Sequence, residues 1–142
     1  MTPGAPKPFK PEFRTLATVT IVVRDYDEAA AWYRKKLNFV LVEDVDLGDG
    51  KRWVVVAPSV RGGAKLLLAK ASSEAQSARI GDQTGGRVGF FLETDDIARD
   101  YARMSARGVA FREEPRREAY GTVAVFADLY GNLFDLIEPR RA

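Results

Sequence analysis

Residues 18–37 read TVTIVVRDYDEAAAWYRKKL, and the same order of apolar and polar positions returns 69 residues later in RVGFFLETDDIARDYARMSA, residues 87–106. Identical residues in the two copies are few, and they include the pairs Asp27 with Asp96 and Arg34 with Arg103. Self-similarity over such a length changes the fold expected of a chain. The sequence therefore predicts two copies of one structural module.

Each copy begins with a strand that leads into a helix. Residues 19–24 are rich in β-branched side chains, which favour a strand. Asp25 or Asp27 can accept from the free amides of a helix over 28–37, and Asn38 is typical of a left-handed helix end. In the second copy the corresponding prediction is a strand over 87–93 and a helix over 96–107.

Three more strands are predicted in each copy. In the first copy, 39–47 and 51–58 form a hairpin around Gly48-Asp49-Gly50, because glycine supplies the positive φ of a tight turn. The polar link 71–86 separates the copies. The remaining predicted strands are 64–70, 109–113, 122–128 and 133–138.

The composition excludes several kinds of chemistry. The 142 residues include no cysteine and no histidine, which excludes disulfides, thiolate and imidazole metal ligands and an imidazole general base. Oxygen ligands are what remains for a metal ion. The 22 basic and 20 acidic side chains give a net charge of +2 and form no long basic stripe, so nucleic acid binding is not indicated.

Length and hydropathy predict one globular domain. A chain of 142 residues can bury one sizeable core, and its apolar runs are far shorter than the roughly 20 residues of a membrane-spanning helix. The first residues are rich in proline and contain no apolar signal-like segment. We therefore predict a disordered tail over 1–12, a single domain over 13–139 with modules over about 13–70 and 86–139, no membrane contact and a cytoplasmic location.

Two segments resemble the vicinal oxygen chelate superfamily, which includes glyoxalase I, extradiol dioxygenases and bleomycin resistance proteins. One runs from Val22 to Ala29 and on into Trp32-Tyr33, and the other is Asp128-Leu129-Tyr130-Gly131-Asn132-Leu133-Phe134-Asp135-Leu136. The resemblance implies an α+β fold in which two tandem βαβββ modules form a curved mixed sheet with a central cleft. It does not imply one reaction, because a single fold hosts many chemistries.

Metal enzymes of this superfamily hold a divalent ion with side chains from the first and last strands of each module. The resemblance places those positions at Thr18, Leu67, Arg87 and Asp135. Asp135 is a good oxygen ligand, whereas Leu67 has no donor atom and Arg87 brings a permanent positive charge. We therefore expect neither a metal nor another cofactor in this chain.

Arg87 and Asp135 admit two interpretations. The first and last strands of a module are expected to be neighbours, so the two side chains can form an ion pair that fills a disused metal cavity. Alternatively, Arg87 stays available for an anionic or carbonyl-bearing ligand. The sequence leaves both open.

Strand alternation predicts the lining of the cleft. Thr18 and Thr20 lie on the face opposite Val19, Ile21 and Val23, whose apolar side chains we expect against the helix. By the same rule Arg87 and Phe91 face the cleft from the fifth strand, and Asp135 from the last. With two aromatic residues from strand ends, the predicted cleft residues are Thr18, Thr20, Trp53, Arg87, Phe91, Tyr120 and Asp135.

The orientation of the residues at strand ends and in loops does not follow from the sequence. Trp53 either lines the cleft or packs in a core or an interface. Tyr120 is either a turn residue or a hydroxyl donor in place of histidine. Arg52 and Gln83 are further residues of this kind.

Because Leu67 and Arg87 replace metal ligands, we predict a metal-independent protein, and the resemblance to the bleomycin resistance proteins implies that it binds a small organic molecule in the cleft. It also implies a homodimer, because sites in those drug-sequestering proteins often lie between two subunits. The alternative is a lyase, isomerase or dioxygenase of the same superfamily that uses an atypical oxygen-ligated metal or no metal. Whether the protein is an enzyme is left open by the sequence.

Overall fold

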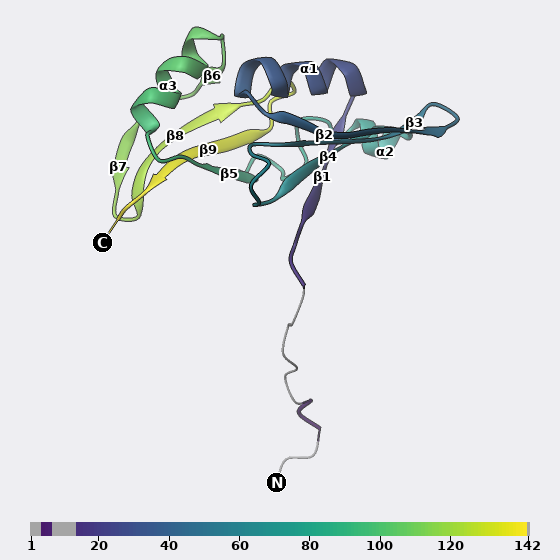
Figure 1. The fold of residues 1–142 in the computed structure, drawn as a ribbon, viewed down its shortest axis with the longest axis horizontal. Helices are drawn as coiled ribbons and strands as arrows, with labels where there is room; N and C mark the ends of the chain where they lie inside the picture. The colour runs from purple at the N-terminus through teal and green to yellow at the C-terminus, as the bar shows by residue number, and fades with distance from the viewer. Residues whose placement is uncertain (1–3, 7–13, 142) are drawn as a thin grey trace.

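The computed structural model describes residues 4–6 and 14–141, and each half of the chain forms a module of the βαβββ type, with one additional short strand in the second half (Figure 1). The first module contains β1 (Thr18–Val23), α1 (Tyr26–Leu37), β2 (Val40–Gly48), β3 (Lys51–Ala57) and β4 (Lys65–Lys70). The link contains α2 (Glu74–Ser77). The second module contains β5 (Phe90–Glu93), α3 (Ile97–Ala106), β6 (Ala110–Phe111), β7 (Arg116–Glu118), β8 (Gly121–Ala127) and β9 (Leu133–Pro139).

The strands form two mixed sheets, one in each module. Their orders are β1-β4-β3-β2 and β5-β9-β8-β6, and β7 pairs with β8 outside the second order. In each module the first strand runs parallel to the last, and the other pairs are antiparallel. The α+β class and the tandem βαβββ arrangement are confirmed. The strands lie in two sheets where we expected one continuous curved sheet, because β1 and β5 each form the edge of their own sheet.

Short polar side chains fix the ends of the helices. Asp25, and not Asp27, caps α1, since its carboxylate accepts a 2.8 Å hydrogen bond from Glu28 N. Asn38 ends this helix with a left-handed φ of 57°. Asp96 caps α3 in the same way, 3.0 Å from Arg99 N.

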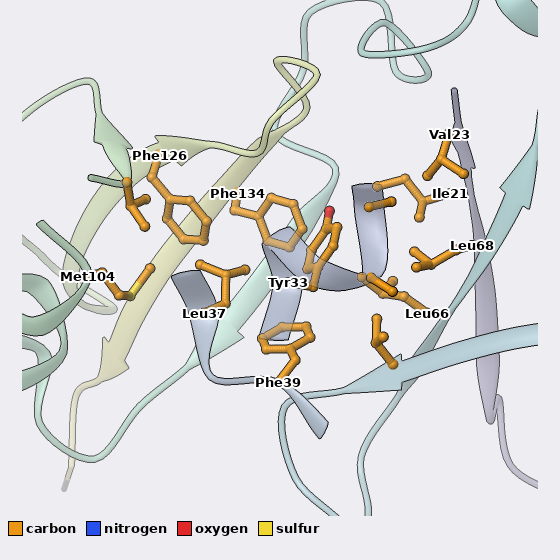
Figure 2. Packing of buried hydrophobic residues seen from close by; sticks show 14 of the residues in the cluster. Ile21, Val23, Tyr33, Leu37, Phe39, Leu66, Leu68, Met104, Phe126 and Phe134 are labelled. Atoms are coloured by element: carbon orange, nitrogen blue, oxygen red, sulfur yellow. The ribbon is translucent and has the colours of Figure 1, made fainter. Parts of the chain in front are cut away.

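One hydrophobic cluster joins the two modules. Figure 2 shows Tyr33 of α1 between Ile21 and Leu68 of the first module and Phe126 and Phe134 of the second. The Tyr33 ring centroid lies 6.2 Å from that of Phe134, and the side chains of all five residues are almost completely buried. Burial of a large apolar side chain stabilises a fold by about 1.5–3 kcal/mol. Helix α1 therefore holds the modules together through a shared core.

The link between the modules returns to the outer edge of β1. There the Gln83 side chain accepts a 2.9 Å hydrogen bond from Val22 N and donates one of 2.7 Å to Thr20 O. One amide thus satisfies main-chain groups that an edge strand leaves unpaired. Gln83 is therefore part of the scaffold at the border of the candidate site.

Two short elements were not predicted. Helix α2 is a single turn within the polar link, with Ser73 as its N-cap, and β7 has the sequence Arg-Arg-Glu, without an apolar residue. Neither has the periodicity by which a sequence signals a helix or a strand. Of the predicted tail over 1–12, all but residues 4–6 lie outside the described residues.

Across residues 4–6 and 14–141, none of the helices has the length and apolar character required to span a membrane.

Candidate functional site

The candidate site lies on the sheet faces that turn away from α1 and α3, which run along the same side of the sheets in Figure 1. We name these surfaces open face A, on the first sheet, and open face B, on the second. Strand register and burial place Thr18, Thr20, Glu43, Val45, Trp53 and Leu67 on open face A. They place Phe91, Glu93, Val125, Asp135 and Ile137 on open face B.

Strand β1 shows the alternation that its sequence predicts. Ile21 and Val23 are completely buried on the helix side, within the shared core. Thr20 is exposed on open face A, and Thr18 is half-buried there. Val19, which we expected against the helix, is 39% exposed near the start of the strand.

Trp53 provides an oriented aromatic surface on open face A. Its side chain is 40% exposed, so the residue is not a core residue of this chain. The indole Nε1 donates a 2.6 Å hydrogen bond to Glu43 Oε2, and Val45 lies opposite Trp53 on the neighbouring strand. Glu43 therefore fixes the ring while leaving it uncovered.

Phe91 is the matching aromatic residue on open face B. It is 65% exposed, whereas its neighbour Phe90 points to the other side of the sheet and stacks on Phe134 at 4.7 Å. The register pairs Phe91 with Asp135 across β5 and β9. An uncovered aromatic ring thus lies next to a carboxyl group.

Asp135 is an uncompensated acidic group. The residue is 7% exposed, and its Oδ1 atom is buried without a hydrogen-bond partner. Burial is the main cause that raises the pKa of Asp135 above its ordinary value, and the charge of Glu113 adds to this. The positive charge of Arg116 opposes both effects.

Arg116 is engaged by other acidic side chains. Its Nε donates a 2.8 Å hydrogen bond to Glu113 Oε1, and its Nη1 forms an ion pair with Glu118. A hydrogen bond with the Tyr120 side chain contributes, after Glu113, to raising the pKa of Arg116. Glu113 also accepts a 3.0 Å hydrogen bond from Val125 N, which ties this charged group to the strand next to Asp135.

The structure does not bring Arg87 and Asp135 together. The two strands are neighbours as expected, but the partner of Asp135 is Phe91, four residues beyond Arg87. Arg87 lies before β5 begins at Phe90. Within the described ranges no ion pair links the two side chains, and Arg87 is exposed.

The residues at the family's metal positions do not fit a divalent ion. Thr18 and Leu67 belong to the first sheet, and Asp135 belongs to the second with no second carboxylate opposite it in the strand register. The described part of the chain has no group of three His, Cys, Asp or Glu side chains that could hold a metal ion. One carboxylate alone is a poor site for a hard cation, which prefers six or more oxygen ligands.

Two surface hollows are lined mainly by residues outside the open faces, although Glu118 borders the first and Glu93 the second. One, of about 500 Å³, is lined by the ends of β7, β8 and β9 and includes Arg117, Glu138 and Arg140. The other, of about 260 Å³, lies between α1 and α3. Neither of these two hollows is lined by a predicted cleft residue.

Three residues that shape the open faces were not among the predicted ones: Glu43, Glu113 and Arg116. From the sequence, Arg116 looks like an ordinary surface charge. Its segment has no alternation of apolar and polar residues, so the sequence does not show which face of the sheet the side chain lies on. Tyr120 was predicted, and it lies at the β7–β8 turn, 53% exposed and next to Arg116.

Comparisons with known proteins agree with this fold. The family model described as Glyoxalase/Bleomycin resistance protein/Dioxygenase superfamily matches residues 15–136. An uncharacterized protein of Shewanella frigidimarina is 51% identical over 126 residues, which cover 88% of this chain and 93% of that protein.

Two solved structures are similar over most of their length. UcmS2 superposes with a TM-score of 0.77 at 32% identity, covering 89% of this chain and 98% of that one. TnmS3, an antibiotic binding protein from Streptomyces sp. CB03234, superposes with a TM-score of 0.74 at 29% identity, covering 91% and 98%. The chain therefore belongs to the glyoxalase/bleomycin resistance protein/dioxygenase superfamily.

Proposed function

We propose that this protein binds a small organic molecule on its open faces without a metal ion. The observation that carries the proposal is the pair of uncovered aromatic rings, Trp53 on open face A and Phe91 on open face B. Small-molecule sites combine such apolar surface with a few fixed polar groups. Here the polar groups are Glu43, which orients Trp53, and Asp135.

The similarity to TnmS3 supports this function. That protein is described as antibiotic binding, and it shares 29% identity and the fold with this chain. By analogy, the ligand is an organic molecule large enough to contact aromatic side chains on both faces. The protein would act as a cytoplasmic binding protein with no nucleic acid partner.

A second copy of the chain completes the site in this proposal. Exposed apolar side chains gather on and beside open face A, and a large uncovered apolar patch is typical of an interface. We propose a homodimer in which open face A of one protomer faces open face B of the other. The residues concerned are Val40, Val42, Val45, Leu47, Trp53 and Phe91.

Tryptophan fluorescence tests ligand binding. The chain has two tryptophans, and Trp32 lies on α1 with its ring 5.2 Å from Tyr33. In a Trp32→Phe variant, the remaining signal reports on Trp53. Titration with carbonyl compounds, aromatic anions and glycopeptide drugs is expected to yield at least one ligand that quenches or shifts it. The matched Trp53→Phe variant is expected to give a much smaller change.

Three further measurements separate the alternatives. Stoichiometric Mn, Fe, Ni or Zn in protein purified without chelators would contradict metal independence. Recovery of the bound ligand unchanged supports a binding protein, whereas a product in the mass spectrum supports the lyase, isomerase or dioxygenase alternative. Sedimentation of a monomer at all concentrations would contradict the dimer.

A further inference from the structure

The carboxyl group of Asp135 is not fully satisfied by hydrogen bonds within the described residues. Its Oδ1 atom is buried and accepts no hydrogen bond. A buried acceptor without a donor costs about 1–3 kcal/mol, and more when the group is charged. Such a group in a native structure calls for a partner that the isolated chain does not supply.

Neither Arg116 nor Arg87 serves as an internal partner of Asp135 Oδ1. Arg116 is held by Glu113 and Glu118. Arg87 precedes β5 and lies four positions before the residue opposite Asp135, and no ion pair of the described residues joins the two side chains. The missing partner of Asp135 is therefore external to the described chain.

The charged side chains around Asp135 favour a partner with a positive charge. Open face B and its rim carry four carboxylates, from Glu93, Glu113, Glu118 and Asp135. They face the guanidinium groups of Arg116 and of Arg112, whose main-chain N donates to Val125 O. Counting Arg87 as well still leaves an excess of one negative charge. A partly covered site with such an excess attracts cations and repels anions.

From this geometry we propose that open face B takes the positively charged end of the ligand, a protonated amine or a guanidinium group, with Asp135 as the acceptor of its N–H groups. The inference rests on the small-molecule function proposed above. The carboxyl group can exchange its two oxygens by a turn about the Cβ–Cγ bond, so a donor needs to reach only one of them.

Phe91 and Val125 complete this subsite. They lie on either side of Asp135 in the strand register. The exposed Phe91 ring offers an apolar wall and a face that attracts cations. The subsite therefore suits an amine carried on an aromatic or aliphatic body better than a free inorganic cation.

Three probes with the same phenyl ring test the proposal: benzylammonium, benzyl alcohol and benzoate. They differ in charge, positive, neutral and negative, while all three keep the phenyl ring. Titrations followed by NMR amide shifts locate each probe through Phe91, Val125 and Asp135. We expect benzylammonium to bind at these amides about tenfold more tightly than benzyl alcohol, and benzoate to bind most weakly.

Matched variants identify the group responsible. Asp135→Asn is expected to reduce benzylammonium binding to the level of benzyl alcohol. Asp49→Asn makes the same change of charge at the exposed β2–β3 turn, where Asn tolerates the φ of 56°, and it is expected to leave the preference intact. Phe91→Ala is expected to weaken all three probes together.

Several outcomes would overturn the proposal. They are equal or tighter binding of benzoate, a preference for benzylammonium that survives in Asp135→Asn, or no binding of any probe at open face B. If the fluorescence titrations still yield a neutral or anionic ligand, the small-molecule function stands and the cationic preference fails. If neither the titrations nor the probes show binding, both proposals fail.

Discussion

The Tyr33 hydroxyl of the first module donates a 2.6 Å hydrogen bond to Asp128 Oδ2 of the second, 95 residues away in the chain. Both groups are buried. The same carboxylate organises the β8–β9 turn, because it accepts hydrogen bonds from Tyr130 N, Asn132 N and Asn132 Nδ2 at 2.8–2.9 Å. One aspartate therefore couples a local turn to the packing of the two modules.

Tyr33→Phe is expected to destabilise the protein. The change leaves the ring in place but removes one buried donor from Asp128, so we expect the free energy of unfolding to fall by about 1–3 kcal/mol. Urea denaturation measures the change. Tyr101→Phe is the control, because its ring packs on Phe111 and no hydrogen bond of its hydroxyl is found within the described residues; a change there as large as that in Tyr33→Phe would contradict the prediction.

The same bond predicts a loss of stability in alkali. Burial above all, and then the charge of Asp128, raises the pKa of Tyr33 well above its ordinary value of 10.0. The unfolded chain therefore loses this proton first, so the stability contribution is complete below pH 10 and falls as the pH rises above it. Urea denaturation between about pH 9 and about pH 11 should show a steeper loss in the wild type than in Tyr33→Phe. Parallel curves would contradict this assignment.

Substitutions at Gly81 and Gly85 test how closely the link between the modules approaches the main chain of Tyr130. Both have positive φ, 77° and 68°, so Ala at either position costs about 1–3 kcal/mol of backbone strain. A Cβ at Gly81 would also lie 2.0 Å from Tyr130 O, whereas one at Gly85 meets nothing within 4 Å. We expect Gly81→Ala to lose several kcal/mol more stability than Gly85→Ala in thermal unfolding. Equal losses would show that the link does not approach Tyr130 this closely.

Asp135→Asn is expected to leave stability unchanged or to raise it. The wild-type carboxyl group is buried with an oxygen that has no donor, and a neutral amide avoids the larger cost of a buried charge. We expect a gain of up to about 1 kcal/mol in the free energy of unfolding, together with the loss of cation binding proposed above. A clear loss of stability would mean that Asp135 serves the fold.

Glu43→Leu tests whether the orientation of Trp53 matters for binding. The substitution removes the acceptor of the 2.6 Å hydrogen bond at an exposed position, so stability should change by less than about 0.5 kcal/mol. The emission spectrum of Trp53, measured in the Trp32→Phe background, should shift, and affinity for a ligand found there should fall several-fold. Unchanged emission and affinity would indicate that the ring is held by packing alone.

Periodicity and capping were sufficient to predict much of the fold. The repeat predicted two βαβββ modules, and alternation along β1 placed Ile21 and Val23 in the core. Asp25 caps the N-terminus of helix α1 and Asn38 ends the helix, as their residue types indicate. These features depend on neighbours in the chain, so local sequence contains the information for them.

The candidate site was predicted less completely. Trp53, Phe91 and Asp135 lie on the open faces, but the neighbours that decide their chemistry were missed. Arg116 lies in a segment without alternation, and Glu43 follows a register shift in β2. The pairing of Arg87 with Asp135 was not found, because neighbouring strands still have a choice of register. A slip of a few residues moves a charge by about 3.3 Å for each residue.

The sequence by itself determined the two modules, the type of most elements and the lack of histidine and cysteine. Only the tertiary structure decided that Phe91 lies opposite Asp135, that Arg116 is held by two glutamates and that Asp135 is left without a donor. The physical reason is the distance along the chain over which each effect acts. Propensity, capping and alternation act over a few residues, whereas register, burial and charge compensation join groups that are far apart in the chain.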